Sequence, residues 1–304
     1  MIQKNNNNSP VINIIINNGE CQEKDETATL IPFMGSAQNT NRHIKKCFCE
    51  YLEGRAEKEK ASRVKDCANS ITFRHYKDLG IKTLDSINLC RERLCLNCCV
   101  ALARKNCKIL NDVFEKTKKH LYFITLTVKN VQGRDLRRTV QIMGQSFSAF
   151  VRAEHMGNFY RSTEITYNEK TDTYHPHIHF ITDKRCSRSY LNNAWAKWFN
   201  KKAGTNYKWL SCKIEPVRDN FSIACELNKY ITKPLNVSDN TIDIFYNQLK
   251  GLRLHGSGGE MKKRVAECKS KAEAEKLNTD EFLSRYDYDI IRYIYDGSNY
   301  ICEN

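Results

Sequence analysis

The sequence predicts an α+β fold in which a central, largely antiparallel β-sheet is flanked by helices. Strand-like runs and amphipathic helices follow one another without the strict alternation of a parallel βαβ protein. One pair of strand-like runs is separated only by the short polar segment NEKTDT, which predicts a hairpin. The length of 304 residues is sufficient to bury a sizeable core.

Composition divides the chain into four segments. Residues 1–45 are polar, with a run of four asparagines and little periodicity, and we expect a disordered leader. Residues 46–118 are basic and cysteine-rich, with cysteines clustered in CRERLCLNCC. Residues 119–260 hold the predicted main domain, and residues 261–304 predict an exposed charged helix followed by a terminal strand.

The main domain begins with LYFITLTV, residues 121–128, whose β-branched and aromatic residues predict a buried strand. Apolar residues at helical spacing follow Gly133, and residues 159–167 and 174–182 form the predicted hairpin. The later elements are a helix around Trp195, a strand at 207–217 and a helix at 221–233, which Pro234 should end.

The charge of the chain favours a polyanionic partner. A net charge of +14 and a pI near 9.1 indicate nucleic acid before a membrane surface, with an unspecialised basic surface as the alternative. No apolar run is long enough to span a bilayer, so we expect a soluble cytoplasmic protein. In that compartment the fourteen cysteines are free thiols or metal ligands, not a disulfide framework.

Three histidines alternate in YHPHIHF, residues 174–180, and on a strand they share one face. A turn centred in NEKTDT places Glu164 opposite His177 on that face. His177, His179 and Glu164 then offer two nitrogens and one carboxylate to a divalent ion, with positions open for water or substrate. This donor set suits Mn²⁺ or Mg²⁺ acting on a phosphate. His175 is expected beside the ligands or facing DNA. The alternative is a histidine pair on a solvated strand.

The segment ELNKYITK places a tyrosine among charged residues. Glu226, Lys229, Tyr230 and Lys233 share one helix face. The lysines would stabilise a phenolate on Tyr230 that attacks phosphorus, and Glu226 is placed as a general base. The alternative is an ordinary solvated helix face.

In this order, the motifs resemble those of the HUH endonucleases, specifically the rolling-circle replication initiators (Rep proteins) of small plasmids of Gram-positive bacteria. FITLTV resembles the strand motif of that family, TEITYNEKTDTYHPHIHF its histidine motif and CELNKYITKPLNV its tyrosine motif. FYNQLKGLRLHGSGGEMKK resembles the segment that follows, and CRERLCLNC resembles the cysteine region. The likeness covers about residues 60–265. It implies the RRM- or ferredoxin-like sheet of HUH nucleases.

The resemblance implies a site-specific nickase of the plasmid's double-strand origin. Tyr230 would attack the scissile phosphodiester and stay joined to the 5′-phosphate, leaving a 3′-OH for the host polymerase. His177 and His179 match the metal ligands of the family. Glu226 occupies the place of a glutamate that activates water in termination, and Lys233 matches a lysine that positions phosphate. The sequence has no G-x-x-x-x-G-K-[ST] phosphate loop, so a host helicase would unwind the DNA. Whether the protein acts as a homodimer is left open.

The cysteine region predicts a structural zinc site. Cys90, Cys95 and Cys98 supply three thiolates, and the resemblance adds Cys67 as the fourth ligand. The other candidates for the fourth ligand are Cys99, Cys107 and His75, and the alternative to a metal site is a set of buried free thiols. The predicted DNA-contacting residues are Arg91, Arg93, Arg104 and Lys105, together with Lys229 and His175.

Two other functions fit parts of the pattern. One is another single-tyrosine HUH nuclease, a relaxase or a transposase. A relaxase usually has its tyrosine before the histidine strand, whereas Tyr230 follows it. The other is a non-catalytic, zinc-containing DNA-binding regulator, which would need neither Tyr230 nor a divalent ion.

Overall fold

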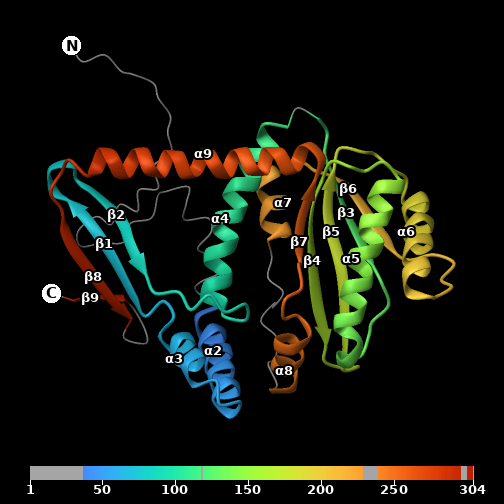
Figure 1. The fold of residues 1–304 in the computed structure, drawn as a ribbon, viewed down its shortest axis with the longest axis horizontal. Helices are drawn as coiled ribbons and strands as arrows, with labels where there is room; N and C mark the ends of the chain where they lie inside the picture. Colours follow the sequence, from blue (N-terminus) through green and yellow to red (C-terminus); the bar gives the residue numbers. More distant parts are fainter. Residues whose placement is uncertain (1–36, 118, 229–238, 296–299, 304) are drawn as a thin grey trace.

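The computed structural model describes residues 37–117, 119–228, 239–295 and 300–303. It confirms the α+β class, with helices flanking two sheets instead of one (Figure 1). Every pairing among the described strands is antiparallel. The second sheet was not expected from the sequence.

The larger sheet has five strands in the order β6-β3-β5-β4-β7. Its strands are β3 (Tyr122–Thr127), β4 (Phe159–Asn168), β5 (Thr173–Thr182), β6 (Cys212–Pro216) and β7 (His255–Gly258). The predicted hairpin is β4–β5 and lies near the middle of the sheet. β5 also pairs with β3 from His177 to Thr182, and β4 also pairs with β7 from Phe159 to Ser162.

Alternation along β5 gives the sheet two different faces. Ile178 and Phe180 point to one face, where they pack with residues of α5 (Leu136–Ala153) and α6 (Arg188–Ala203). Ile181 belongs to the other face, together with Phe123. There the cover comes from α4 (Leu96–Glu115), α7 (Asn220–Leu227) and α9 (Gly259–Leu283). The histidines of β5 lie on this second face. Of the helix predicted at 221–233, residues 229–233 lie outside the described residues.

The smaller sheet combines two strands that follow α3 (Lys58–Asp66) with the last two strands of the described chain. Its order is β2-β1-β8-β9, built from β1 (Ser70–Tyr76), β2 (Ile81–Ile87), β8 (Asp289–Tyr295) and β9 (Tyr300–Glu303). The short helix η2 (Lys77–Leu79) connects β1 to β2. A second short helix, η3 (Gly133–Asp135), comes directly before α5. Because β8 pairs with β1, the second and fourth of the segments predicted from composition share one sheet.

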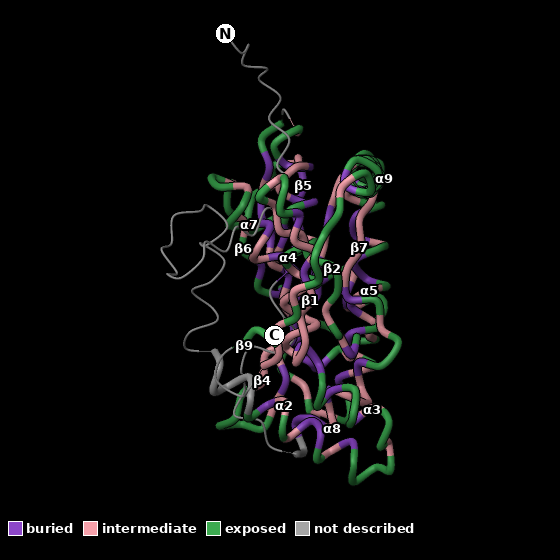
Figure 2. Tube along the Cα trace, turned by 90° about the vertical axis from the view of Figure 1, so that its left-hand side faces the viewer, coloured by how far each residue is buried: buried purple, intermediate pink, exposed green. Residues whose placement is uncertain are grey.

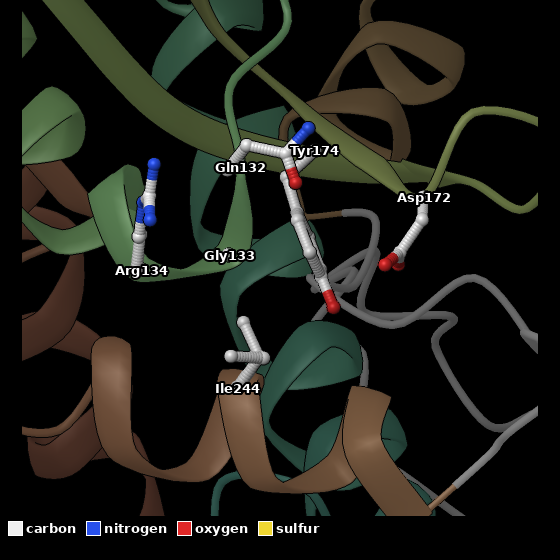
Figure 3. Close-up of a pocket in the computed structure, with 6 residues that line it drawn as sticks. All are labelled: Gln132, Gly133, Arg134, Asp172, Tyr174 and Ile244. Carbon is white, nitrogen blue, oxygen red and sulfur yellow. The ribbon is translucent and has the colours of Figure 1, made fainter.

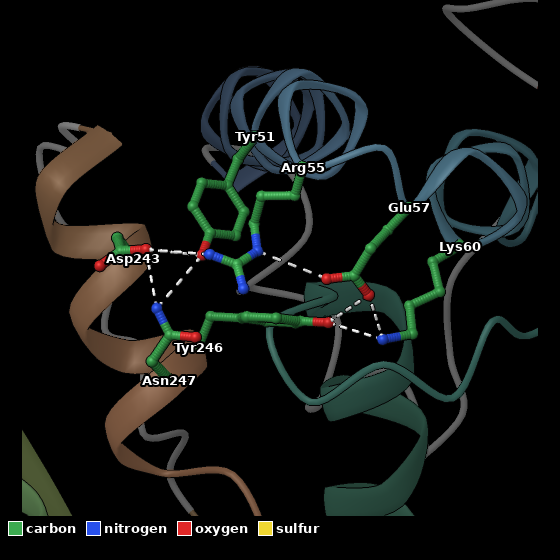
Figure 4. A network of polar contacts seen from close by, with 7 residues as sticks. All are labelled: Tyr51, Arg55, Glu57, Lys60, Asp243, Tyr246 and Asn247. Atoms are coloured by element: carbon green, nitrogen blue, oxygen red, sulfur yellow. Dashed lines mark hydrogen bonds and ion pairs between the residues drawn. The ribbon is translucent and has the colours of Figure 1, made fainter.

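Helix α8 (Asp239–Gln248) packs against α2 (Ala37–Gly54), and α3 (Lys58–Asp66) lies beside α2. The predicted end of the leader at residue 45 falls within α2. A polar network joins the three helices (Figure 4). Tyr51 Oη donates to Asp243 Oδ1 at 2.8 Å, Tyr246 Oη donates to Glu57 Oε2 at 2.9 Å, and Lys60 also contacts Glu57.

Burial is concentrated between the helices and the sheets, whereas α9 is exposed along most of its length (Figure 2). The buried residues of α9 are Met261, Val265, Cys268 and Leu283, and the helix between Cys268 and Leu283 is rich in charged residues. Within the described ranges, no helix has the length and apolar character needed to cross a membrane.

Candidate functional site

The β4–β5 hairpin brings Glu164, His177 and His179 together. Glu164 pairs with His177 across the two strands, which confirms the register predicted from the turn. His179 Nε2 lies 3.2 Å and His177 Nε2 lies 3.4 Å from the same carboxylate oxygen, Oε2 of Glu164. All three side chains are buried. Two imidazole nitrogens and one carboxylate oxygen therefore converge on one point.

The outer nitrogens of the two rings have their own partners. His177 Nδ1 lies 3.2 Å from the carbonyl oxygen of His175, and a carbonyl only accepts, so this nitrogen carries the proton. When the ring is neutral and binds a metal, Nε2 is then the nitrogen that carries the lone pair, whereas a protonated Nε2 can donate to Glu164. His179 Nδ1 lies 3.0 Å from Thr125 Oγ1, and the ring of His179 stacks on Phe123 at 5.2 Å between centroids.

The electrostatics favour an ionised carboxylate at this point. Burial acts to raise the pKa of Glu164, but contacts with the imidazoles of His177 and His179 outweigh burial and lower the pKa below its ordinary value. The charged form is the one that binds a cation. Two imidazole nitrogens and one carboxylate oxygen this close together could hold a divalent cation.

His175 lies beside this group but is not one of its three members. Its ring centroid is 5.4 Å from that of His177, and its side chain is half-buried. Burial lowers the pKa of His175, and the nearby His177 lowers it further. This position agrees with a neighbour of the ligands; its contact with DNA stays a prediction.

The tyrosine motif is only partly described. Tyr230, Lys229 and Lys233 lie outside the described residues, whereas Glu226 lies in the last turn of α7. The α7 residues Ala224 and Leu227 are fully buried in the apolar cluster of the histidine face. The chain therefore enters residues 229–238 from the cover of the sheet face that carries Glu164 and the two histidines.

A second convergent group contains Cys67, Cys90, Cys95 and Cys98. The Sγ–Sγ distances are 3.5 Å for Cys67–Cys98, Cys90–Cys98 and Cys67–Cys95. Four sulfurs each ~2.3 Å from a tetrahedral zinc ion would lie roughly 3.8 Å apart. The spacing therefore fits a closed four-thiolate zinc site, and it places Cys67 in the fourth position. Cys99, Cys107 and His75 are not in the group.

The backbone around the cysteines also favours thiolates. Cys90 N–H donates to Cys67 Sγ at 3.4 Å, and Arg91 N–H donates to Cys98 Sγ at 3.1 Å. Hydrogen bonds from Cys90 and Cys95 lower the pKa of Cys67, and the contacts with Cys67 raise the pKa of those two thiols. Four thiols this close cannot all ionise unless a cation lies between them.

The predicted DNA-contacting residues of this region have different environments. Arg91, Arg104 and Lys105 are exposed, the last two on α4. The guanidinium of Arg93 instead donates to the carbonyl oxygens of Leu249 and Leu252, just after α8. Arg93 thus links the cysteine turn to α8, a contact that does not depend on DNA.

A cavity of about 290 Å³ lies where the end of the β4–β5 hairpin meets η3 and α8 (Figure 3). Its lining residues are Gln132, Gly133, Arg134, Asp172, Tyr174 and Ile244. None of these belongs to the histidine or the cysteine group. Tyr174 points to the opposite sheet face from His175 and His177, so we assign no chemistry to this cavity.

The fold and the two groups define a class of protein: an α+β protein with a histidine–carboxylate group on a sheet face and a cysteine group that supports the covering helices. A family model for replication proteins, Rep_1, matches residues 81–299. The chain belongs to this family of replication proteins, which confirms the resemblance to the plasmid Rep proteins of Gram-positive bacteria.

Individual relatives agree with the family assignment. The chain is 28% identical over 230 residues to Protein rep of Streptococcus pneumoniae, an alignment covering 67% of this chain and 71% of the relative. It is 26% identical over 243 residues to Protein rep of Bacillus amyloliquefaciens, with the same two coverages. Protein rep of Staphylococcus aureus is 29% identical over 154 residues, covering 45% of this chain and 67% of the relative. No solved structure matches the chain with significant similarity.

Proposed function

We propose that this replication protein initiates rolling-circle replication by nicking one strand of a plasmid's double-strand origin. The observation that carries the proposal is the convergence of Glu164, His177 and His179 on one sheet face of a protein in a replication family. When held by these three residues, a Mn²⁺ or Mg²⁺ ion would polarise the scissile phosphate. The cysteine group would hold a structural Zn²⁺.

Residues of the tyrosine motif carry out the rest of the proposed reaction. The Tyr230 oxygen attacks phosphorus, a tyrosine–phosphate bond forms, and the bond from phosphorus to the 3′ oxygen breaks. The phenol proton passes to a base, and the leaving oxygen takes up a proton to become a 3′-OH. Lys229 and Lys233 stabilise the negative charge. Because the 5′-phosphate stays on the protein, the 3′-OH is free to prime a host polymerase while a host helicase opens the duplex.

The direct test is incubation with a supercoiled plasmid that carries its origin, with Mn²⁺ or Mg²⁺ present. We expect nicked circles and DNA attached covalently to the protein. Binding of the origin without any nick would instead support a non-catalytic regulator. Nicking that leaves no joined protein would exclude the tyrosine mechanism.

The carboxylate ligand gives a first prediction. Glu164→Gln keeps the shape of the side chain but removes its charge, so the metal concentration needed for half-maximal nicking should rise at least about tenfold. The matched control is Glu169→Gln, the same change at an exposed position of the same hairpin. Equal metal dependence of the two variants and the parent would show that Glu164 is not a ligand.

Glu226 gives a second prediction, about termination. If Glu226 activates water for the second cleavage, Glu226→Ala should nick at nearly the parental rate but leave the displaced strand unresolved. The measurement compares the initial nicking rate with the yield of released single-stranded circles. Equal loss in both steps would contradict a role confined to termination.

A further inference from the structure

The helix α6 and the loop after it form an unusually basic stretch. Between residues 184 and 214 the sequence has eight lysines and arginines and no aspartate or glutamate. The whole chain has 49 basic and 35 acidic residues, so a stretch of this length would be expected to contain several acids. Glu154, just after α5, accepts hydrogen bonds from Tyr190 and Trp198 of this helix, and the excess of basic residues in the stretch still favours a polyanion.

Trp209 is the most exposed aromatic residue in this stretch. Its exposed fraction is 61%, whereas Trp195 is fully buried and Trp198 is tied to Glu154 through a 3.0 Å hydrogen bond from Nε1. Lys208 beside it is also exposed. A single exposed aromatic residue is common, so the case depends on how its loop is held and where it lies.

The backbone on both sides of Trp209 is fixed by two asparagines of α6. Asn200 Nδ2 donates to the carbonyl of Tyr207 at 2.8 Å, and Asn200 Oδ1 accepts from Tyr207 N–H at 3.0 Å. Asn192 Oδ1 accepts from Cys212 N–H at 2.8 Å, and Leu210 is buried. The backbone on both sides of Trp209 is therefore held by side-chain hydrogen bonds while the indole is exposed, which would limit the ordering needed on binding.

The loop that carries Trp209 lies beside the C-terminal end of β3, where Thr127 pairs with His177. Thr127 pairs with His177 in the sheet, and both N–H and Oγ1 of Thr127 donate to the carbonyl of Ser211, at 3.2 and 2.8 Å. Two strand spacings, about 10 Å, therefore separate the backbones of Ser211 and His177. Lys129 also reaches the loop, with Nζ 5.0 Å from the ring centroid of Tyr207.

We propose that Lys129, Tyr207, Lys208 and Trp209, the Trp209 surface, bind the single DNA strand that leaves the Glu164–His177–His179 group, with a base stacked on the Trp209 indole. Stacking on an aromatic ring combined with nearby lysines is the usual way in which proteins hold single strands without reading their sequence. Lys213 contributes less charge, because Glu215 pairs with it at 2.9 Å. The position of the strand relative to the nick depends on the proposed function; binding itself does not.

The test measures the affinity for oligothymidylate without added divalent metal, so that cleavage plays no part. Trp209→Ala should weaken binding about tenfold, as expected for one lost base stack. Trp209→Phe should keep most of the affinity while losing the quenching of indole fluorescence that we expect in the parent. The matched control is Phe282→Ala, which removes an aromatic ring 48% exposed on α9.

Two further variants separate a local contact of Lys208 with DNA from a general effect of positive charge. Lys208→Ala should lower both the affinity and its salt dependence, whereas Lys269→Ala on the exposed part of α9 should change neither. Parental affinity in Trp209→Ala, or no quenching of indole fluorescence in the parent, would overturn the inference, as would an equal loss of affinity for duplex DNA. If Trp209→Ala weakens binding but the parent does not nick, the inference stands and the proposed function fails.

Discussion

Replacing Tyr230 by phenylalanine is expected to lower origin nicking at least about a thousandfold and to eliminate the covalent adduct. The change removes only the oxygen that would attack phosphorus, and loss of a nucleophile commonly reduces turnover by this much or more. Because the ring and the neighbouring lysines remain, affinity for origin DNA should stay near the parental value. The measurements are conversion of supercoiled plasmid to nicked circles and the yield of protein–DNA adduct that survives denaturation.

The control for this prediction is Tyr167→Phe, which removes the same atom from the β4–β5 hairpin. Tyr167 Oη donates to Asp172 at 2.9 Å, and its side chain lies on the opposite face of β4 from Glu164. This variant should nick like the parent. An adduct that persists in Tyr230→Phe would assign the nucleophile to a different residue.

The histidine group could be predicted from the sequence because its geometry is local. A short turn fixes which residues of a hairpin face each other, and the alternation of strand side chains then places Glu164 with His177. The supports supplied by Phe123 and Thr125 were missed. Their strand, β3, is distant in sequence, although alternation along FITLT would have placed both side chains on one face.

The rest of the fold depends on contacts between residues far apart in the sequence. No pattern of neighbouring residues in the sequence predicts that β8 pairs with β1 or that α8 packs on α2. Arg93 looks like a solvated charge in CRERLC, yet its partners are carbonyls more than a hundred residues away. The resemblance had implied Cys67 as the fourth cysteine, and the fold groups Cys67 with the other three and leaves Cys99 outside. The sequence does carry a signal for the Trp209 surface, the missing acids between 184 and 214, but no single motif contains it.

Replacing Cys95 and Cys98 by serine is expected to remove bound zinc and to destabilise the protein strongly. The four thiols join the end of α3, the chain after β2 and the start of α4 inside one apolar cluster, so serine would remove metal ligands and also place hydroxyls in that core. Structural zinc contributes roughly 10 kcal/mol in small domains. Even part of that would lower the melting temperature by about 10 °C or more. Metal analysis and thermal unfolding would measure the two effects.

Cys99→Ser separates the zinc site from cysteine content in general. Cys99 is adjacent to Cys98, but its Sγ donates to the Arg93 carbonyl at 3.0 Å and it is outside the group of four. We expect Cys99→Ser to keep parental zinc content and melting temperature. Unchanged zinc content in the Cys95 and Cys98 variants would refute the site.

Because Arg93 joins the cysteine turn to the end of α8, and α4 packs on α7, loss of zinc should disturb both helices that flank residues 229–238. Nicking should therefore fall with zinc content even at temperatures where the variants remain folded.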